Sequence, residues 1–266
     1  MIRKEMISDF QENKALVLKL YQELDKANGN DINQILGKYT NEDYFFRGMH
    51  PFYELYGSGA VADEFWKPLR NSLAPIQRRQ DIFIAGINDV DKNTEWVCSM
   101  GHLMGLFDND WLGIKANRKM AFLRYAEFNR IEKGLIVETA LFCDIISLMK
   151  QAGLNPLPLQ TGADFITPGP RTHDGLLFDK KDHKESQKTL DLVNKMCIDL
   201  TSSDMESPID ELKETWQDDM IWYGPSGIGA TYTIDRYQEQ HQGPFSEGLS
   251  NLKFHGHVCR IAEGNF

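Results

Sequence analysis

The chain has 266 residues, which is long enough for two domains or for one large one. A composition of 41% hydrophobic and 26% charged residues is that of a globular protein and excludes collagen-like, coiled-coil and disordered chains. The 29 basic and 39 acidic side chains leave a net charge of −10, which is the wrong sign for a protein that holds nucleic acid by its phosphates.

No segment of the sequence predicts export or membrane insertion. Residues 1–9 are not followed by an apolar run of signal-peptide length, and no stretch approaches 18 uncharged apolar residues. The four cysteines are Cys98, Cys143, Cys197 and Cys259; they lie far apart and form no CxxC pair. We therefore expect a cytoplasmic protein with reduced thiols, without a membrane partner and without a metal or cofactor site.

Helices come first in the chain. Leu16, Leu20 and Leu24 recur at helical spacing and predict a helix over residues 10–27 that ends at an Asn-Gly-Asn turn. A second helix is expected from residue 31, an aromatic strand over 43–48 and a further helix over 57–73.

Strands dominate the next part, where the hydrophobic period changes to two. Strands are expected from Ile82 to residue 86 and over 95–107, 119–131 and 135–143, followed by a helix over 145–152. Helices followed by a run of strands indicate an α+β fold in which a curved antiparallel sheet wraps around the N-terminal helices.

An internal repeat with an offset of 176 residues follows from the sequence. The segment Asp43 to Gly48 has a counterpart in Asp219 to Gly224, and the same offset relates Leu24 to Leu200 and Pro68 to Pro244. We expect a complete domain over residues 10–155, a Pro/Gly linker over 156–185 and a partial second domain over 186–266.

The second copy is expected to repeat the helices and first strands of the first copy. Its predicted elements cover residues 186–200, 211–216, 220–224, 234–241 and, as a strand, 255–262. The counterparts of residues 91 onward would begin after residue 266, so the chain is either naturally shortened or a fragment of a longer one. An open strand edge should then be covered by another chain.

Two residues stand out as candidates for acid/base chemistry. His102 shares one strand face with Trp96, Cys98 and other apolar side chains, where a lone histidine is usually a satisfied core residue. Asp144 ends a strand and precedes a helix, so it is either an N-cap or, in a pocket, a carboxylate with a raised pKa.

Two further residues are weaker candidates. Glu127 lies in mid-strand and needs an arginine or histidine partner if it points inward, and His50 could reach the mouth of a cavity. Three other patterns are excluded: Ser226 lacks the GxSxG order, His255 and His257 have no third ligand, and the glycines of 224–229 precede no GK[ST].

The chain resembles the SnoaL-like polyketide cyclase family of the nuclear-transport-factor-two-like superfamily, in its tandem-domain bacterial branch. The motifs that carry the resemblance are Phe65-Trp66-Lys67-Pro68-Leu69, Arg78-Arg79-Gln80-Asp81-Ile82, Gly101-His102, Trp111-Leu112-Gly113-Ile114, Arg124-Tyr125-Ala126-Glu127-Phe128, Gly134 to Asp144, Trp222-Tyr223-Gly224-Pro225, Gly227-Ile228-Gly229 and His241 to Phe245. The family pattern Pro-Ala-Thr-Gly-Lys is replaced by Lys115 to Lys119, which changes a turn beside the pocket.

This resemblance implies a cone-shaped fold and a cofactor-free intramolecular aldol cyclisation. It implies that Asp144 moves a proton at the carbon α to a carbonyl and that His102 hydrogen-bonds the developing enolate. The expected pocket residues are Trp96, His50, Trp66, Tyr125, Glu127 and Phe128. Because the second copy has no counterpart of Asp144, only the first domain can hold a complete site.

Two classes of function stay open. One is an acid/base enzyme acting on a small apolar carbonyl compound, and the other is a non-catalytic module that binds a small molecule or a protein. Within the superfamily, isomerase chemistry would use Tyr125, and epoxide hydrolysis would need Arg124 between Asp144 and Glu127. A homodimer or an intramolecular pseudo-dimer is expected.

Overall fold

A computed structural model describes residues 10–202, 208–251 and 253–266. Its main feature is a six-stranded sheet in the order β2-β1-β6-β5-β4-β3. The strands are β1 (Thr40–Gly48), β2 (Glu54–Tyr56), β3 (Gln77–Ile87), β4 (Glu95–Leu106), β5 (Met120–Glu132) and β6 (Leu135–Cys143). This curled sheet with its helices confirms the predicted α+β class.

The direction of one strand pair differs from the prediction of an antiparallel sheet. Four neighbouring pairs are antiparallel, but β1 pairs with β6 in the parallel direction. These two strands are separated by about ninety residues of chain, so no hairpin turn fixes their relative direction.

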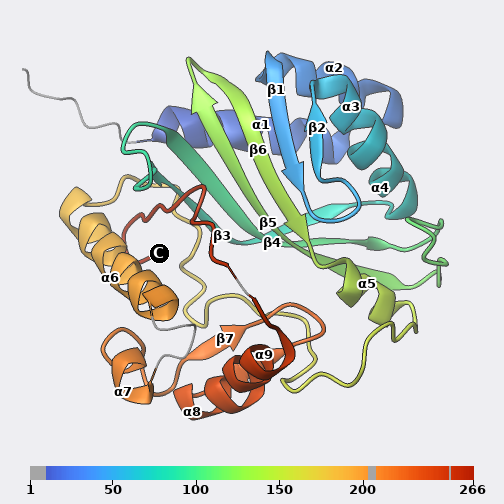
Figure 1. Cartoon of the computed structure of the whole chain (residues 1–266). Coiled ribbons are helices and arrows are strands. Elements are labelled where there is room, and N and C mark those ends of the chain that lie inside the picture. Colours follow the sequence, from blue (N-terminus) through green and yellow to red (C-terminus); the bar gives the residue numbers. More distant parts are fainter. Residues whose placement is uncertain (1–9, 203–207, 252) are drawn as a thin grey trace, which may run out of the picture.

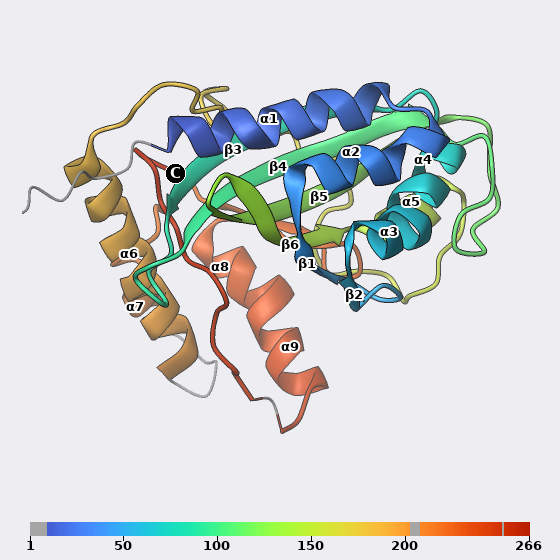
Figure 2. The same cartoon turned by 90° about the horizontal axis from the view of Figure 1, so that it is seen from above.

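Helices pack on one face of the sheet, which we call the inner face. They are α1 (Gln11–Lys26), a 3-10 turn (Gly29–Asp31), α2 (Ile32–Tyr39), α3 (Ser58–Val61), a π-helical turn (Ala62–Trp66) and α4 (Lys67–Ser72), with α5 (Ile145–Gln151) following the last strand. Figure 2 shows α1 lying alongside β3 and β4. Val17, Leu20 and Leu24 recur at helical spacing along α1 and are buried.

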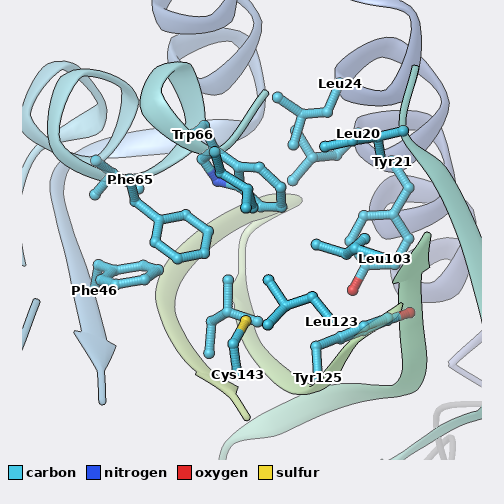
Figure 3. Packing of buried hydrophobic residues seen from close by; sticks show 14 of the residues in the cluster. Leu20, Tyr21, Leu24, Phe46, Phe65, Trp66, Leu103, Leu123, Tyr125 and Cys143 are labelled. Atoms are coloured by element: carbon cyan, nitrogen blue, oxygen red, sulfur yellow. The ribbon is translucent and has the colours of Figure 1, made fainter. Parts of the chain in front are cut away.

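The hydrophobic core lies between these helices and the inner face. Leu103 on β4 and Leu123 on β5 are fully buried there, opposite Leu20 of α1 and Phe65 of the π-helical turn. Figure 3 shows that the rings of Phe46, Phe65 and Trp66 line one side of this core and those of Tyr21 and Tyr125 the other. The interior of the cone is therefore strongly aromatic.

A β-bulge at Asp81 bends the sheet between β3 and β4. The pairing passes from Gln80 opposite Gly101 directly to Ile82 opposite Met100. Gly101 has a φ of +156°, and a Cβ there would lie 2.0 Å from the carbonyl oxygen of Arg79. Only glycine fits at this close approach of the two backbones.

The rest of the chain packs against the opposite, outer face of the sheet (Figure 1). Its elements are α6 (His183–Ser202), α7 (Ile209–Leu212), β7 (Ile221–Tyr223), β8 (Ala230–Tyr232), α8 (Ile234–Tyr237), a π-helical turn (Gln238–Gln242) and α9 (Gly243–Gly248). The bounds of β8, α8, the second π-helical turn and α9 lie 176 residues after those of β2, α3, the first π-helical turn and α4.

One predicted strand of the second part is absent. Residues 255–262 were expected as a strand, but they have no regular secondary structure. Strand β3, which lies 176 residues earlier, pairs with β4, and the described part of residues 186–266 contains no strand that pairs with residues 255–262. The segment instead follows the edge of β3, where the side chain of Asn88 donates to the carbonyl oxygen of Val258 at 3.0 Å.

The C-terminal segment is fixed to α1 by a buried ion pair between Lys14 and Glu263. The other carboxylate oxygen of Glu263 accepts from the backbone N–H of Ala85 at 2.7 Å, and Lys14 also donates to the carbonyl oxygen of Leu177 at 2.7 Å. Among the described residues, none of the helices is both long and apolar enough to cross a bilayer.

Candidate functional site

A buried charged cluster lies on the inner face of the sheet. It consists of Asp25 on α1, Arg78 on β3 and Glu127 on β5. Nη1 of Arg78 lies 3.3 Å from Oε2 of Glu127, and Nε of Arg78 lies 3.5 Å from Oδ1 of Asp25. The side chains of Arg78 and Glu127 are each 3% exposed, and that of Asp25 is 26% exposed. Asp25 is thus the member of the cluster nearest to solvent.

Three aromatic rings surround the guanidinium group of Arg78. Its Cζ lies 3.8 Å from the ring centroid of Tyr21, 5.2 Å from that of Tyr125 and 5.7 Å from that of Trp66. These contacts stabilise a buried cation. Nη2 of Arg78 is buried and has no hydrogen-bond partner within the part of the chain that the structure describes.

Glu127 is held by side chains on both of its oxygens. Besides the contact to Arg78, Oε1 accepts from Nδ2 of Asn129 at 3.0 Å, and Thr139 donates to Oδ1 of Asn129 at 2.6 Å. Asn129 also donates to the hydroxyl of Tyr21 at 3.3 Å. This network orients the carboxylate within an apolar interior, where a partly satisfied polar group would be costly.

A second hydrogen-bonded group adjoins this network. The hydroxyls of Ser99 and Tyr125 lie 2.8 Å apart, and Gln80 donates to Ser99 at 3.0 Å. Alternation along the strands places all three side chains on the inner face, as Gln80 pairs with Gly101 and Ser99 with Glu127. The cone interior therefore presents hydroxyl and amide groups beside the charged cluster.

Burial sets the protonation behaviour of this site. Burial raises the pKa of Asp25 above its ordinary value, and the nearby charges of Arg78 and Arg70 oppose that rise. Burial also raises the pKa of Tyr125, which keeps its hydroxyl neutral and able to donate. Burial by itself lowers the pKa of Arg78, but the net shift is upward, because the nearby carboxylates of Glu127 and Asp25 stabilise the charged guanidinium group.

His102 and Asp144 lie on the outer face, outside the cone. Oδ1 of Asp144 accepts from the backbone N–H of Ser147 at 2.9 Å and caps α5, and Oδ2 accepts from the N–H of Ser226 at 2.9 Å. Nδ1 of His102 lies 3.6 Å from Oδ2 of Asp81, and burial lowers the pKa of His102. Asp144 thus makes the N-cap contact that its position before a helix predicts.

The two residues line one common cavity. Its volume is about 20 Å³, and it is lined in part by the linker around Ala163 and by the loop at Ser226. A space of this size holds about one water molecule. Arg124, beside Asp144, donates to the carbonyl oxygens of Tyr223 and Gly224 at 3.0 and 3.2 Å, so it contacts the second part of the chain.

The six expected pocket residues separate into three groups. Trp66, Tyr125 and Glu127 lie together in the cone around Arg78. Trp96 and Phe128 are on the outer face, where Phe128 packs against the cluster of Ile84, Cys98 and Leu177. His50 is exposed in a loop, and its Nδ1 lies 2.5 Å from the hydroxyl of Tyr53.

Glu127 points inward and its partner is Arg78, one of the two residue types expected for it from the sequence. Arg124 is not placed between Asp144 and Glu127, because Arg124 and Glu127 occupy opposite faces of β5. Asp25 and Asn129 are not among the residues that the sequence predicts for the site. Alternation along β3 gave no signal for Arg78, because the bulge at Asp81 shifts the alternation that Phe83 begins and thereby turns Gln80 and Arg78 to the inner face.

The described residues contain no group of three or more His, Cys, Asp or Glu side chains that could hold a metal ion. His255 and His257 lie in the irregular C-terminal segment. The Asp25–Arg78–Glu127 cluster combines one cation with two carboxylates, an arrangement that can hold a polar atom and move a proton.

Solved structures similar to this one are SnoaL-like polyketide cyclases and other proteins of the NTF2-like fold. A structure named as a SnoaL-like polyketide cyclase from Jannaschia sp. CCS1 has 16% identity and a TM-score of 0.42, over 59% of this chain and 99% of the other. One named as a polyketide cyclase from Xanthomonas campestris pv. campestris has 17% identity and a TM-score of 0.42, over 55% and 99%.

A third similar structure is IdmH from Streptomyces antibioticus, with 11% identity and a TM-score of 0.42 over 53% of this chain and 97% of that one. The sequence matches no family model and no curated protein. The printed names of these structures include the family that the sequence motifs resemble.

Proposed function

We propose that the first domain catalyses cofactor-free proton transfer on a small, largely apolar carbonyl compound inside the cone, with Glu127 as the acid/base. The observation that carries this proposal is a buried carboxylate, held by Arg78 and Asn129, in an otherwise aromatic interior. A carboxylate oriented in this way can act as the general base toward a C–H group of a ligand held in the same interior. An aldol-type cyclisation would use the same step.

The hydrogen-bond donors beside Glu127 could stabilise the enolate that forms when the proton is removed. Removal of a proton α to a carbonyl develops negative charge on the carbonyl oxygen, and a preorganised donor stabilises that charge. The neutral hydroxyls of Tyr21 and Tyr125 lie in the same interior, and burial raises the pKa of both. The polar groups needed for both halves of a proton transfer therefore lie on the inner face.

The resemblance instead gives the acid/base role to Asp144 and the enolate contact to His102. This alternative assignment would place the reaction on the outer face of the sheet. A shared lining of one cavity supports it. The hydrogen bonds of both Asp144 oxygens to backbone N–H groups favour Glu127 instead, because a capping carboxylate would have to release a helix end to accept a proton.

The test follows exchange of the methyl protons of acetophenone in D₂O by NMR, with and without protein. We expect the wild-type protein to accelerate exchange and Glu127→Gln to reduce the acceleration by about a hundredfold or more, the scale of one general base. Asp144→Asn is the matched control and should retain the exchange. Loss of exchange in Asp144→Asn with full exchange in Glu127→Gln would move the chemistry to the outer face.

A second candidate is a non-catalytic module that binds a small molecule. Asp144 caps α5 and binds the Ser226 loop. These structural contacts favour a binding module, because they occupy the carboxylate to which the resemblance gives the acid/base role. Saturable binding of acetophenone without accelerated exchange would support the module and contradict the enzyme.

A further inference from the structure

We infer that Arg78 is the residue that binds the oxygen of the ligand in the cone, and that it selects a neutral oxygen, as in a ketone, over a carboxylate or phosphate. This inference deepens the proposed function, because it rests on a ligand that enters the same interior. It adds to the proposed function the residue that recognises the ligand, Arg78, and the chemical class of the ligand, a compound with a neutral oxygen acceptor.

The first step is the unused donors of Arg78. Nη1 contacts Glu127, whereas Nη2 and Nε are both buried without a hydrogen-bond partner among residues 10–202, 208–251 and 253–266. Nε has Oδ1 of Asp25 at 3.5 Å, so Nη2 is the nitrogen without a nearby carboxylate. A buried guanidinium N–H without an acceptor is costly. The position next to Nη2 is therefore one where an oxygen acceptor would gain a charge-assisted hydrogen bond.

The second step is the shape of the surroundings. The guanidinium group is bounded by the rings of Tyr21, Tyr125 and Trp66, and the core beyond them contains Phe46 and Phe65. An acceptor that reaches Nη2 must carry an apolar or aromatic body, because the walls are rings and aliphatic chains. Figure 3 shows that Tyr21 and Tyr125 direct their hydroxyls to the same side of this core.

The third step is charge. Asp25 and Glu127 already lie within 3.5 and 3.3 Å of the single cation Arg78. A carboxylate or phosphate ligand would bring a third negative group to that cation in a poorly solvated interior, where like charges repel strongly. The other nearby cation, Arg70, donates to the backbone carbonyl oxygens of Asp25 and Ala27 at the end of α1. A neutral oxygen avoids this repulsion.

The experiment measures dissociation constants by ligand-observed NMR for three probes of one shape: acetophenone, α-methylstyrene, in which CH₂ replaces the oxygen, and benzoate. We expect the wild-type protein to bind acetophenone about tenfold or more tightly than α-methylstyrene, the value of one hydrogen bond to a charged group. Benzoate should bind more weakly than acetophenone. Arg78→Met should remove the preference for acetophenone over α-methylstyrene.

Arg124→Met is the matched control, because Arg124 is a partly buried arginine on the outer face of β5. It should keep the wild-type preference. If Arg78→Met does not fold, as judged by circular dichroism, Asp25→Asn, Arg78→Met and Glu127→Gln are combined so that no buried charge is left unpaired. The same loss of preference is expected in that variant.

Three results would overturn the inference: a preference that survives Arg78→Met or the triple variant, tighter binding of benzoate than of acetophenone, or no binding of acetophenone to the wild type. Failure of the proposed function looks different. A preference that depends on Arg78, without exchange of the acetophenone methyl protons, leaves Arg78 as a binding residue and rejects catalysis. Exchange that depends on Glu127, without a ligand preference that depends on Arg78, supports catalysis and rejects Arg78 as the residue that binds the ligand oxygen.

Discussion

At the scale of single residues, two carboxylates differ in the groups that hold them. Glu127 accepts from the side chains of Arg78 and Asn129, whereas Asp144 accepts from the backbone N–H groups of Ser147 and Ser226. Side chains can turn toward a ligand, but a backbone N–H at a helix start cannot move without unfolding the turn. Glu127 is therefore better placed to exchange a proton, and Asp144 to fix structure.

This difference predicts the stability of the Asp144→Asn variant. The amide keeps one oxygen acceptor but presents an NH₂ group to one of the two N–H donors. We expect a loss of about 1 kcal/mol in the free energy of unfolding, the usual value of an N-cap. Urea denaturation followed by circular dichroism measures it. An unchanged unfolding free energy would show that the contacts of Asp144 do not stabilise the fold.

His102 makes the stability depend on pH. Burial lowers its pKa below the ordinary value of 6.5, so the unfolded chain binds a proton at a higher pH than the folded one. Stability is therefore complete above the unfolded pKa and falls as the pH drops from about 6.5 toward the lowered folded value. His102→Gln should flatten this part of the profile. His241, whose pKa burial also lowers, provides the comparison variant His241→Gln.

An identical loss of stability between pH 7.5 and 5.5 in the wild type and in His102→Gln would contradict that account. The imidazole of His102 faces Asp81, which raises its pKa, and Arg124 and Arg79, which lower it. The net change is a lowered pKa, and burial is its main cause.

At the scale of elements, the bulge between β3 and β4 determines which side chains reach the cone. Asp81 is the extra residue, so Arg78 and Gln80 on one side of it and Phe83 on the other all face inward. Without the bulge, alternation would carry one of these sets to the outer face. The place of Arg78 opposite Glu127 thus depends on an irregularity of the strand.

Gly101→Ala tests this dependence. A Cβ would meet the carbonyl oxygen of Arg79 at 2.0 Å, so the two strands must separate or the bulge must shift. We expect a loss of about 1–3 kcal/mol in unfolding free energy, the usual cost of a strained backbone, together with weaker ligand binding. Gly29→Ala is the control, because nothing lies within 4 Å of its Cβ position. Equal stability of the two variants would contradict the role of the bulge.

The elements with a strong hydrophobic period could be predicted from the sequence. The helix over residues 10–27 and the strands over 95–107 and 135–143 correspond to α1, β4 and β6 within one residue at each end. The start of β3 could not be predicted, because Arg78, Arg79 and Gln80 are polar and their burial depends on partners distant in the chain. The face of the sheet that holds His102 could not be predicted either, since alternation groups residues without saying which group meets the helices.

At the scale of the whole molecule, the outer face of the sheet is covered by the linker and by the second part of the chain. Leu177 is buried against Ile84 and Cys98, and Ile261 and Phe266 pack on the same cluster. This cover explains why an apolar strand face with one histidine is buried although it lies outside the cone. The homodimer or pseudo-dimer expected from the repeat stays a prediction, which light scattering of the full chain tests.

The Lys14–Glu263 pair connects the two ends of the described chain. Both side chains are nearly fully buried, so Lys14→Met would leave Glu263 without its cation. We expect a loss of about 3–5 kcal/mol in unfolding free energy. The double variant with Glu263→Met should recover much of this loss. Equal losses in the single and double variants would show that the charge pairing itself is unimportant.

The most direct test of the account is a crystal structure of the full chain with acetophenone bound. We predict that the ligand lies on the inner face, with its ring among Tyr21, Tyr125 and Trp66 and its oxygen within hydrogen-bond distance of Nη2 of Arg78. Acetophenone in the outer cavity beside His102 and Asp144, or bound only elsewhere on the protein, would contradict it.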